Sequence, residues 1–123
     1  MGEFYVRKSP RYRAIKVKGT YNPQEVSFAN KEKIAEFVRG IDRPDTAVSF
    51  LDYIEDKGIL HLEYVTRTAR GYAPSRCTNV YIGEYLVFNE ATGEFSAWDE
   101  REFDDAFRKL GWGEEADHGP GVR

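Results

Sequence analysis

Residues 83–107 constrain the fold more than any other stretch, because they specify three elements and both connections between them. Hydrophobic runs at 85–88 and 95–98 flank a polar loop that ends at Gly93. A glycine there supplies the left-handed backbone that a short hairpin loop needs. Asp99 and Glu102 then form a capping-box pattern, and Phe103 and Phe107 recur at helical spacing over 100–110. The stretch predicts a hairpin followed by an amphipathic helix.

Similar patterns assign most of the remaining chain. Alternation over 12–18 predicts a strand, and 19–23 is expected to be a turn. Asn30 is expected to cap a helix with apolar residues at 34, 37, 38 and 41, which ends near Gly40. Runs at 46–54 and 59–66 around Gly58 predict a second hairpin, and 78–82 predicts a further strand. We therefore expect an α+β fold, with an antiparallel sheet of about five or six strands and two helices packed on one face.

Length and composition favour a single folded domain. The chain has 123 residues, of which 41% are hydrophobic and 15% aromatic, enough for one core. We expect residues 1–112 to form the domain and residues 113–123, which lack apolar spacing, to form a mobile C-terminal tail. No apolar run approaches the roughly 18–20 residues that span a bilayer. With no signal-peptide pattern at the N-terminus, we expect no membrane association and a cytoplasmic location.

The residues that carry chemistry are sparse. One cysteine and two histidines exclude a disulfide framework and leave no zinc-ligand spacing. Cys77 and His61 could form a nucleophile–base pair, but the sequence shows no third group. Paired carboxylates at 100, 102, 104 and 105 lie toward the polar side of the last helix, as solvated residues do. We therefore expect no catalytic residues, metal or cofactor, and a protein that is not an enzyme.

Two acid-free segments are the candidates for binding. Residues 66–80 contain no acid, and their ligand- or partner-binding candidates are Arg67, Arg70, Tyr72 and Arg76. Arginine binds phosphate or carboxylate through two parallel hydrogen bonds, and an aromatic ring can stack on a base. The second candidate is a basic N-terminal patch of Arg7, Lys8, Arg11 and Arg13. The net charge of −3 argues against a dedicated nucleic-acid-binding protein. The alternative interpretation of both segments is an ordinary solvated surface.

Both ends of the chain carry a pattern seen in one group of proteins. An Arg-Lys-x-Pro start precedes the first strand at 7–10, Gly-Glu-Tyr opens an apolar run at 83, and Gly-Glu-Phe at 93–95 precedes a short helix with spaced aromatics. In these features the chain resembles small, mostly uncharacterised proteins encoded by bacteriophages and prophages. The usual motif has Asp where Glu84 stands, and the middle of the chain, 45–80, has no counterpart.

The resemblance implies a biological context but no catalytic residues. It implies a phage-encoded, non-enzymatic binding protein that engages and modulates a host bacterial protein in the host cytoplasm. One alternative is a sponge that sequesters a nucleotide-derived immune signal, an anti-defence role. A second alternative is a small nucleic-acid-binding protein. A sheet rich in aromatic residues with only two helices to cover it would also suit a homodimer.

Overall fold

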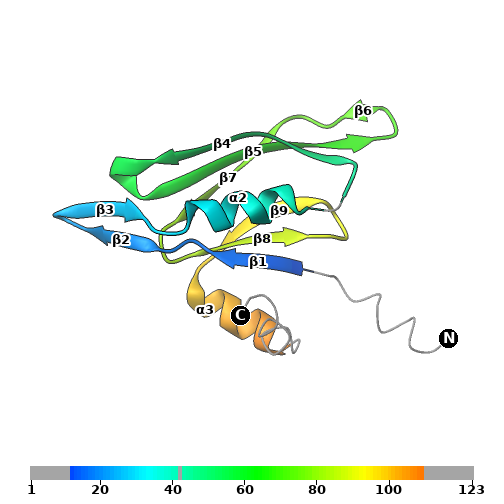
Figure 1. Ribbon diagram of the computed structural model, residues 1–123. Helices are drawn as coiled ribbons and strands as arrows, with labels where there is room; N and C mark the ends of the chain where they lie inside the picture. Colours follow the sequence, from blue (N-terminus) through cyan, green and yellow to red (C-terminus); the bar gives the residue numbers. More distant parts are fainter. Residues whose placement is uncertain (1–11, 42, 110–123) are drawn as a thin grey trace.

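The structure of the protein is a computed structural model, which describes residues 12–41 and 43–109 (Figure 1). The elements in chain order are β1 (Tyr12–Lys16), β2 (Gly19–Asn22), β3 (Glu25–Phe28), α2 (Lys31–Arg39), β4 (Thr46–Ile54), the short 3-10 helix η1 (Glu55–Lys57), β5 (Ile59–Thr68), β6 (Gly71–Tyr72), β7 (Arg76–Tyr81), β8 (Tyr85–Asn89), β9 (Glu94–Trp98) and α3 (Glu100–Lys109).

The strands form two main antiparallel sheets. One has the order β1-β8-β9, and in the other β5 lies between β4 and β7 and also pairs with β6 near its end. The hairpin of β2 and β3 projects from the body (Figure 1). The expected α+β class with antiparallel strands and two helices is confirmed, but the described residues contain nine strands. The higher count arises because 19–23, expected to be a turn, belongs to the β2–β3 hairpin, and because β6 lies between the strands predicted at 59–66 and 78–82.

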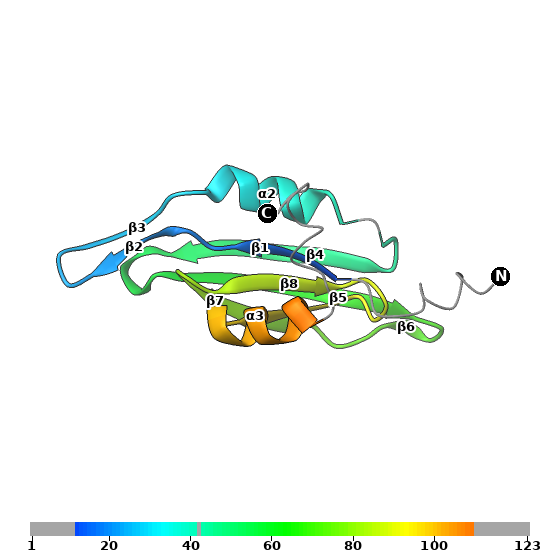
Figure 2. The same cartoon turned by 90° about the horizontal axis from the view of Figure 1, so that it is seen from below.

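The two helices lie on opposite sides of the β1-β8-β9 sheet, whereas the sequence suggested one face (Figure 2). Leu86 and Phe88 of β8 pack in the main core with Ile34 and Phe37 of α2. Val87, which points to the other face, packs with Phe103 of α3. The run in β8 is apolar on both faces, so each face needs its own cover.

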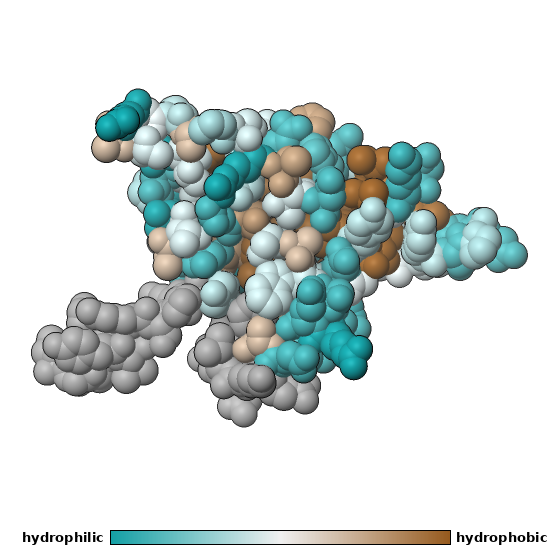
Figure 3. Space-filling model, turned by 180° about the vertical axis from the view of Figure 1, so that it is seen from behind, coloured by the Kyte–Doolittle hydropathy of each residue, from teal (hydrophilic) through white to brown (hydrophobic). Residues whose placement is uncertain are grey.

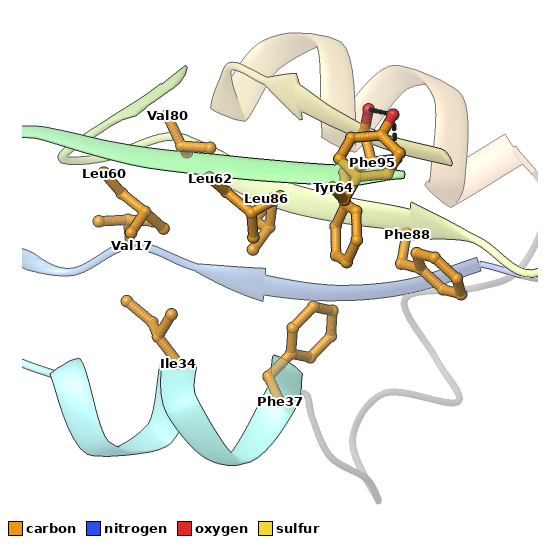
Figure 4. Close-up of a cluster of buried hydrophobic side chains, with 10 residues drawn as sticks. All are labelled: Val17, Ile34, Phe37, Leu60, Leu62, Tyr64, Val80, Leu86, Phe88 and Phe95. Carbon is orange, nitrogen blue, oxygen red and sulfur yellow. Dashed lines mark hydrogen bonds between the residues drawn. The ribbon is translucent and has the colours of Figure 1, made fainter. Parts of the chain in front are cut away.

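The main core lies between the two sheets and α2. Figure 4 shows Ile34 and Phe37 pointing from α2 toward the side chains that the strands contribute. The buried members of this core are Val17, Ile34, Phe37, Leu60, Leu62, Tyr64, Val80, Leu86, Phe88 and Phe95.

Side chains connect the two sheets where β7 and β9 run close to each other without pairing. The Tyr64 hydroxyl accepts a hydrogen bond from the backbone N–H of Phe95 at 3.1 Å and donates to the carbonyl oxygen of Phe95 at 3.5 Å. The Thr78 hydroxyl donates to the same carbonyl at 3.3 Å. We call this contact of Tyr64 and Thr78 with Phe95 the seam; it satisfies buried backbone groups that no neighbouring strand reaches.

Helix α2 is attached to the free edge of β1. Asn30, expected to cap the helix, makes no side-chain cap hydrogen bond. Its amide instead donates to the Lys16 carbonyl at 2.8 Å and accepts from the Lys18 N–H at 2.9 Å. These two hydrogen bonds satisfy the backbone carbonyl of Lys16 and the backbone N–H of Lys18, as a neighbouring strand would do at a sheet edge.

The expected hairpins and the last helix are confirmed. Gly58 and Gly93 have φ values of 66° and 78°, the left-handed conformation that their turns require. Glu102 N–H donates to Asp99 Oδ1 at 2.8 Å, and Asp99 N–H donates to Glu102 Oε1 at 3.1 Å, which completes the capping box. The expected tail at 113–123 lies outside the described residues.

The seam makes a prediction about stability. Tyr64→Phe removes the hydroxyl and leaves the buried N–H of Phe95 without its partner, so the free energy of unfolding should fall by about 1–3 kcal/mol. Tyr21→Phe is the matched control, because Tyr21 is 61% exposed and should tolerate the loss of its hydroxyl. Urea unfolding of both variants measures the difference, and equal stability of the two would contradict the role of the seam.

The position of α3 makes a second prediction. Phe103 is 7% exposed and stacks on Tyr85 with ring centroids 3.9 Å apart. Phe103→Ala should therefore lower the free energy of unfolding by about 3–5 kcal/mol, the range for a buried phenylalanine. Thermal and urea unfolding test this value, and a variant as stable as the parent would show that α3 does not pack on the sheet.

Candidate functional site

Three of the four expected binding residues lie on the hairpin formed by β5 and β6. Arg67 and Tyr72 are directly opposite each other in the strand pairing, so their side chains share one face. Arg70 lies in the turn between the strands. The Thr68 hydroxyl accepts from the Arg70 N–H at 3.2 Å and donates to the Gly71 carbonyl at 2.7 Å, which holds the turn in place. We call residues 67–72 the hairpin tip; it projects from the body at the end remote from the β2–β3 hairpin (Figure 1).

The hairpin tip presents its side chains to solvent. Every residue from Arg67 to Tyr72 is exposed, and the Tyr72 exposure of 65% exceeds that of any other large hydrophobic residue in the described part of the chain. Among the described residues, no carboxylate forms a salt bridge with Arg67 or Arg70. Arg43, by contrast, pairs with Asp45 at 2.9 Å. The guanidinium groups of the tip are thus available for an external anion.

Arg76, the fourth candidate, belongs to a different environment. It is opposite Tyr64 in the pairing of β7 with β5, and its guanidinium forms a salt bridge with Glu94 of β9. Hydrogen bonds to Glu94 and to Tyr64 raise the pKa of Arg76 above its ordinary value. This contact crosses between the two sheets beside the seam. The expected cluster of three arginines is therefore not assembled, because Arg76 already has a partner.

The basic N-terminal patch is placed only in part. Arg13 lies in β1, where its guanidinium donates to the Gly40 carbonyl at 2.5 Å and lies 5.5 Å from the centroid of the Phe37 ring. Arg13 thus binds the C-terminal end of α2, where backbone carbonyls attract a cation. Arg7, Lys8 and Arg11 lie outside the described residues.

A second surface, not predicted from the sequence, is the side of the β4-β5-β7 sheet that faces away from the core. Leu60, Leu62 and Tyr64 of β5 point into the core, so the intervening residues point outward. We call this surface the outer face, and none of the described helices packs on it. Its residues are Ala47, Phe50, Asp52 and Ile54 of β4, Ile59, His61, Glu63 and Val65 of β5, and Cys77, Asn79 and Tyr81 of β7. The alternation of 59–65 was the signal that could have revealed it.

His61 lies near the middle of the outer face and is held on both sides of its ring. Nδ1 lies 2.6 Å from Asn79 Oδ1, and Nε2 lies 2.8 Å from Glu63 Oε2. The hydrogen bonds to Glu63 and Asn79 raise the pKa of His61 above 6.5, with a further contribution from the charge of Asp52. Two acceptor oxygens are best satisfied by an imidazolium, which donates from both nitrogens.

The geometry does not support a catalytic role for the Cys77–His61 pair or for the carboxylates of α3. Both nitrogens of His61 contact Asn79 and Glu63, and Cys77 is exposed opposite Glu63. Glu102 serves the capping box, and Glu100 pairs with Lys16 at 3.4 Å. Within the described ranges, no group of three or more His, Cys, Asp or Glu side chains is placed to hold a metal ion. No helix among the described residues is long and apolar enough to cross a membrane.

Comparison with known proteins adds no assignment to this site. No family model, curated protein or solved structure matches the chain.

The environment of His61 makes a titration prediction. Glu63→Gln removes the carboxylate charge, so the pKa of His61 should fall toward 6.5, the ordinary value of the side chain. A pKa that is raised in the folded state stabilises the fold below the unfolded pKa, and this contribution disappears as pH rises through the folded pKa. NMR titration of the histidine ring signals tests this shift, and a His118→Asn variant assigns the two histidines.

The parent should therefore lose more stability than Glu63→Gln as pH rises from below 6.5 through the folded pKa of His61. Identical His61 titration in the parent and in Glu63→Gln would show that the pair does not form in solution.

Proposed function

We propose that this protein is a non-enzymatic binding protein whose hairpin tip recognises an acidic surface of another protein. The partner, in keeping with the resemblance to phage and prophage products, is a bacterial host protein that the binding modulates. The observation that supports the proposal is the exposed pair of Arg67 and Tyr72 on one face of a projecting hairpin, where neither Arg67 nor Arg70 forms a salt bridge with a carboxylate of the described residues.

The residue types of the tip suit a protein interface. Arginine and tyrosine are enriched among the residues that contribute most to binding energy in protein complexes. Arg67 and Arg70 have no salt bridge to lose within the described residues when they contact a partner. The Thr68 hydrogen bonds order the turn in advance, which lowers the entropic cost of binding. An acidic partner surface follows from the two guanidinium groups.

A nucleotide-derived signal is the second candidate, favoured by the register of Arg67 with Tyr72. A guanidinium on phosphate beside a phenol ring under a base is a common way to hold a nucleotide. The tip, however, is an open ribbon of exposed residues, and Arg76 pairs with Glu94 instead of completing the cluster. Small ligands bind mostly in concave sites that surround them, so the protein partner fits the tip better.

The test compares two triple variants of the full chain. The first carries Arg67→Ala, Arg70→Ala and Tyr72→Ala. The matched control, with Arg39→Ala, Arg101→Ala and Tyr21→Ala, removes the same residue types from other exposed positions. Both should melt like the parent. A partner captured from bacterial lysate by the tagged parent is then purified and titrated by calorimetry.

The tip variant should bind this partner at least about a hundredfold more weakly, since each charge-assisted contact contributes roughly 1.5–3 kcal/mol. The control should bind like the parent, and parent binding should weaken as salt rises, because salt screens exposed charges. Equal affinity of both triple variants would remove the tip from the account. Binding of a cyclic or linear nucleotide by the parent, lost in the tip variant, would favour the second candidate.

A further inference from the structure

Strand β4 has one edge with which none of the described strands pairs. Strand β5 occupies the opposite edge, and Figure 1 shows β4 along the upper margin of the molecule. The strand is nine residues long and contains no lysine, arginine or proline. Lysine and proline are residues that often prevent a free edge from pairing with another chain. The free edge of β4 is therefore open to an added strand.

The fold occupies the other long edges of its two main sheets. The amide of Asn30 bonds the backbone at the edge of β1, and the seam connects β7 with β9. The free edge of β4 has no such cover. Among the described residues, Thr46 alone uses a backbone group of this edge, since its N–H donates to the carbonyl of Arg43 at 3.0 Å.

The backbone groups on the free edge belong to alternate residues of β4. Arg67 N–H donates to the Asp45 carbonyl at 2.6 Å, whereas the Thr66 carbonyl accepts from Ala73 on the other side of β5. Odd-numbered residues of β5 therefore bond β4, and even-numbered residues bond the other neighbours. The residues of β4 that pair with even-numbered residues direct their N–H and C=O groups away from β5; they are Thr46, Val48, Leu51 and Tyr53.

These outward-directed residues match one another in a single antiparallel alignment of two β4 strands. When Val48 lies opposite Leu51 of a second copy, Thr46 lies opposite Tyr53 of that copy, and a two-fold axis repeats both pairs. Any other antiparallel alignment leaves some of these residues without an outward-directed partner in β4, so fewer hydrogen bonds form. The register shift of β4 at Ser49 then faces the same shift in the second copy. The backbone geometry thus selects one alignment.

The side chains fit the same alignment. Val48 and Leu51, which are partly buried against the core, would cover each other on the inner side of the joined strands. On the outer side, Asp52 would lie opposite the uncharged Ala47 of the second copy, so no like charges meet. Phe50, which is 48% exposed, lies next to the axis and would pack beside Phe50 of the second copy.

We propose that two copies of this chain join edge to edge through β4, antiparallel and about a two-fold axis perpendicular to the sheet. The two β4-β5-β7 sheets then form one continuous sheet, with both outer faces on the same side of it. The hydrophobic residues beside the base of each β2–β3 hairpin belong to that side (Figure 3). Because the axis reverses the strand direction, the two hairpin tips lie at opposite ends of the joined sheet. Dimerisation needs no other partner and is independent of the binding function proposed above.

The first test uses the unaltered full chain. Sedimentation velocity over a dilution series should show a monomer–dimer equilibrium. Hydrogen exchange followed by NMR should then show that the amides of Val48 and Leu51 exchange rapidly in the monomer and slowly in the dimer, because their N–H groups bond only the second copy. The amides of Ala47 and Asp52 are the internal control, since both are directed to β5 and are protected in the monomer as well.

The second test places opposite charges at one exposed position. Ala47→Asp would bring a carboxylate opposite Asp52 of the second copy, and Ala47→Lys would bring an ammonium group there. The aspartate variant should dimerise at least about fourfold more weakly than the lysine variant, because the axis makes each cross-strand charge pair occur twice. The matched controls are Ala97→Asp and Ala97→Lys, at an exposed position of β9, which should dimerise equally.

Three results would each overturn the proposal. The parent stays monomeric throughout the dilution series, or a dimer forms while the amides of Val48 and Leu51 exchange as fast as in the monomer. The third is equal dimerisation of the two Ala47 variants when both melt like the parent. If either variant melts early, the exchange of the Val48 and Leu51 amides in the parent decides alone.

Discussion

The hydrogen bonds between the Tyr64 hydroxyl and the backbone of Phe95 determine how the rest of the molecule is arranged. Two sheets meet at this point, yet β7 and β9 share no backbone pairing among the described residues. Side chains of β5 and β7 supply the missing partners for β9, and α2 covers the core from the other direction. One face of the β4-β5-β7 sheet packs in the main core, so the opposite face, the outer face, is exposed to solvent. Strand β5 continues past the core into the hairpin tip.

The same arrangement divides the arginines between those with partners inside the molecule and those exposed to solvent. Arg13 binds the end of α2, and Arg76 pairs with Glu94 next to the seam, so both help to position large elements. Arg67 and Arg70 lie nine and six residues before Arg76 in sequence, on the β5–β6 hairpin that continues past the pairing of β5 with β7. Substituting Arg76 would remove a contact between the two sheets, whereas substituting Arg67 or Arg70 would remove no salt bridge within the described residues. The acid-free segment at 66–80 looks uniform in sequence, but its arginines lie in two different environments of the fold.

Local patterns allowed part of this structure to be predicted. The turns at Gly58 and Gly93 and the capping box of Asp99 with Glu102 each depend on residues within one turn or hairpin, so their sequence signals sufficed. The side-chain cap expected from Asn30 does not form, because its partners, Lys16 and Lys18, lie at and just beyond the end of β1, which only the folded chain brings near. The prediction that both helices pack on one face was wrong. A continuous apolar run in β8 shows that both faces are covered, but it does not indicate which helix covers which face. The division of the arginines depends on Glu94, and no spacing in the sequence connects it to Arg76.

Amide hydrogen exchange of Phe95, followed by NMR on the full chain, tests the seam most directly. In the pairing of β9 with β8, Phe95 lies opposite Phe88, and its N–H is directed to the Tyr64 hydroxyl of the other sheet. If the two sheets form one closed unit, this amide should exchange only through global unfolding, as slowly as the most protected amides of β8. Rapid exchange of the Phe95 amide, while the amides of β8 stay protected, would mean that the sheets open along the seam and that the account of the fold is wrong.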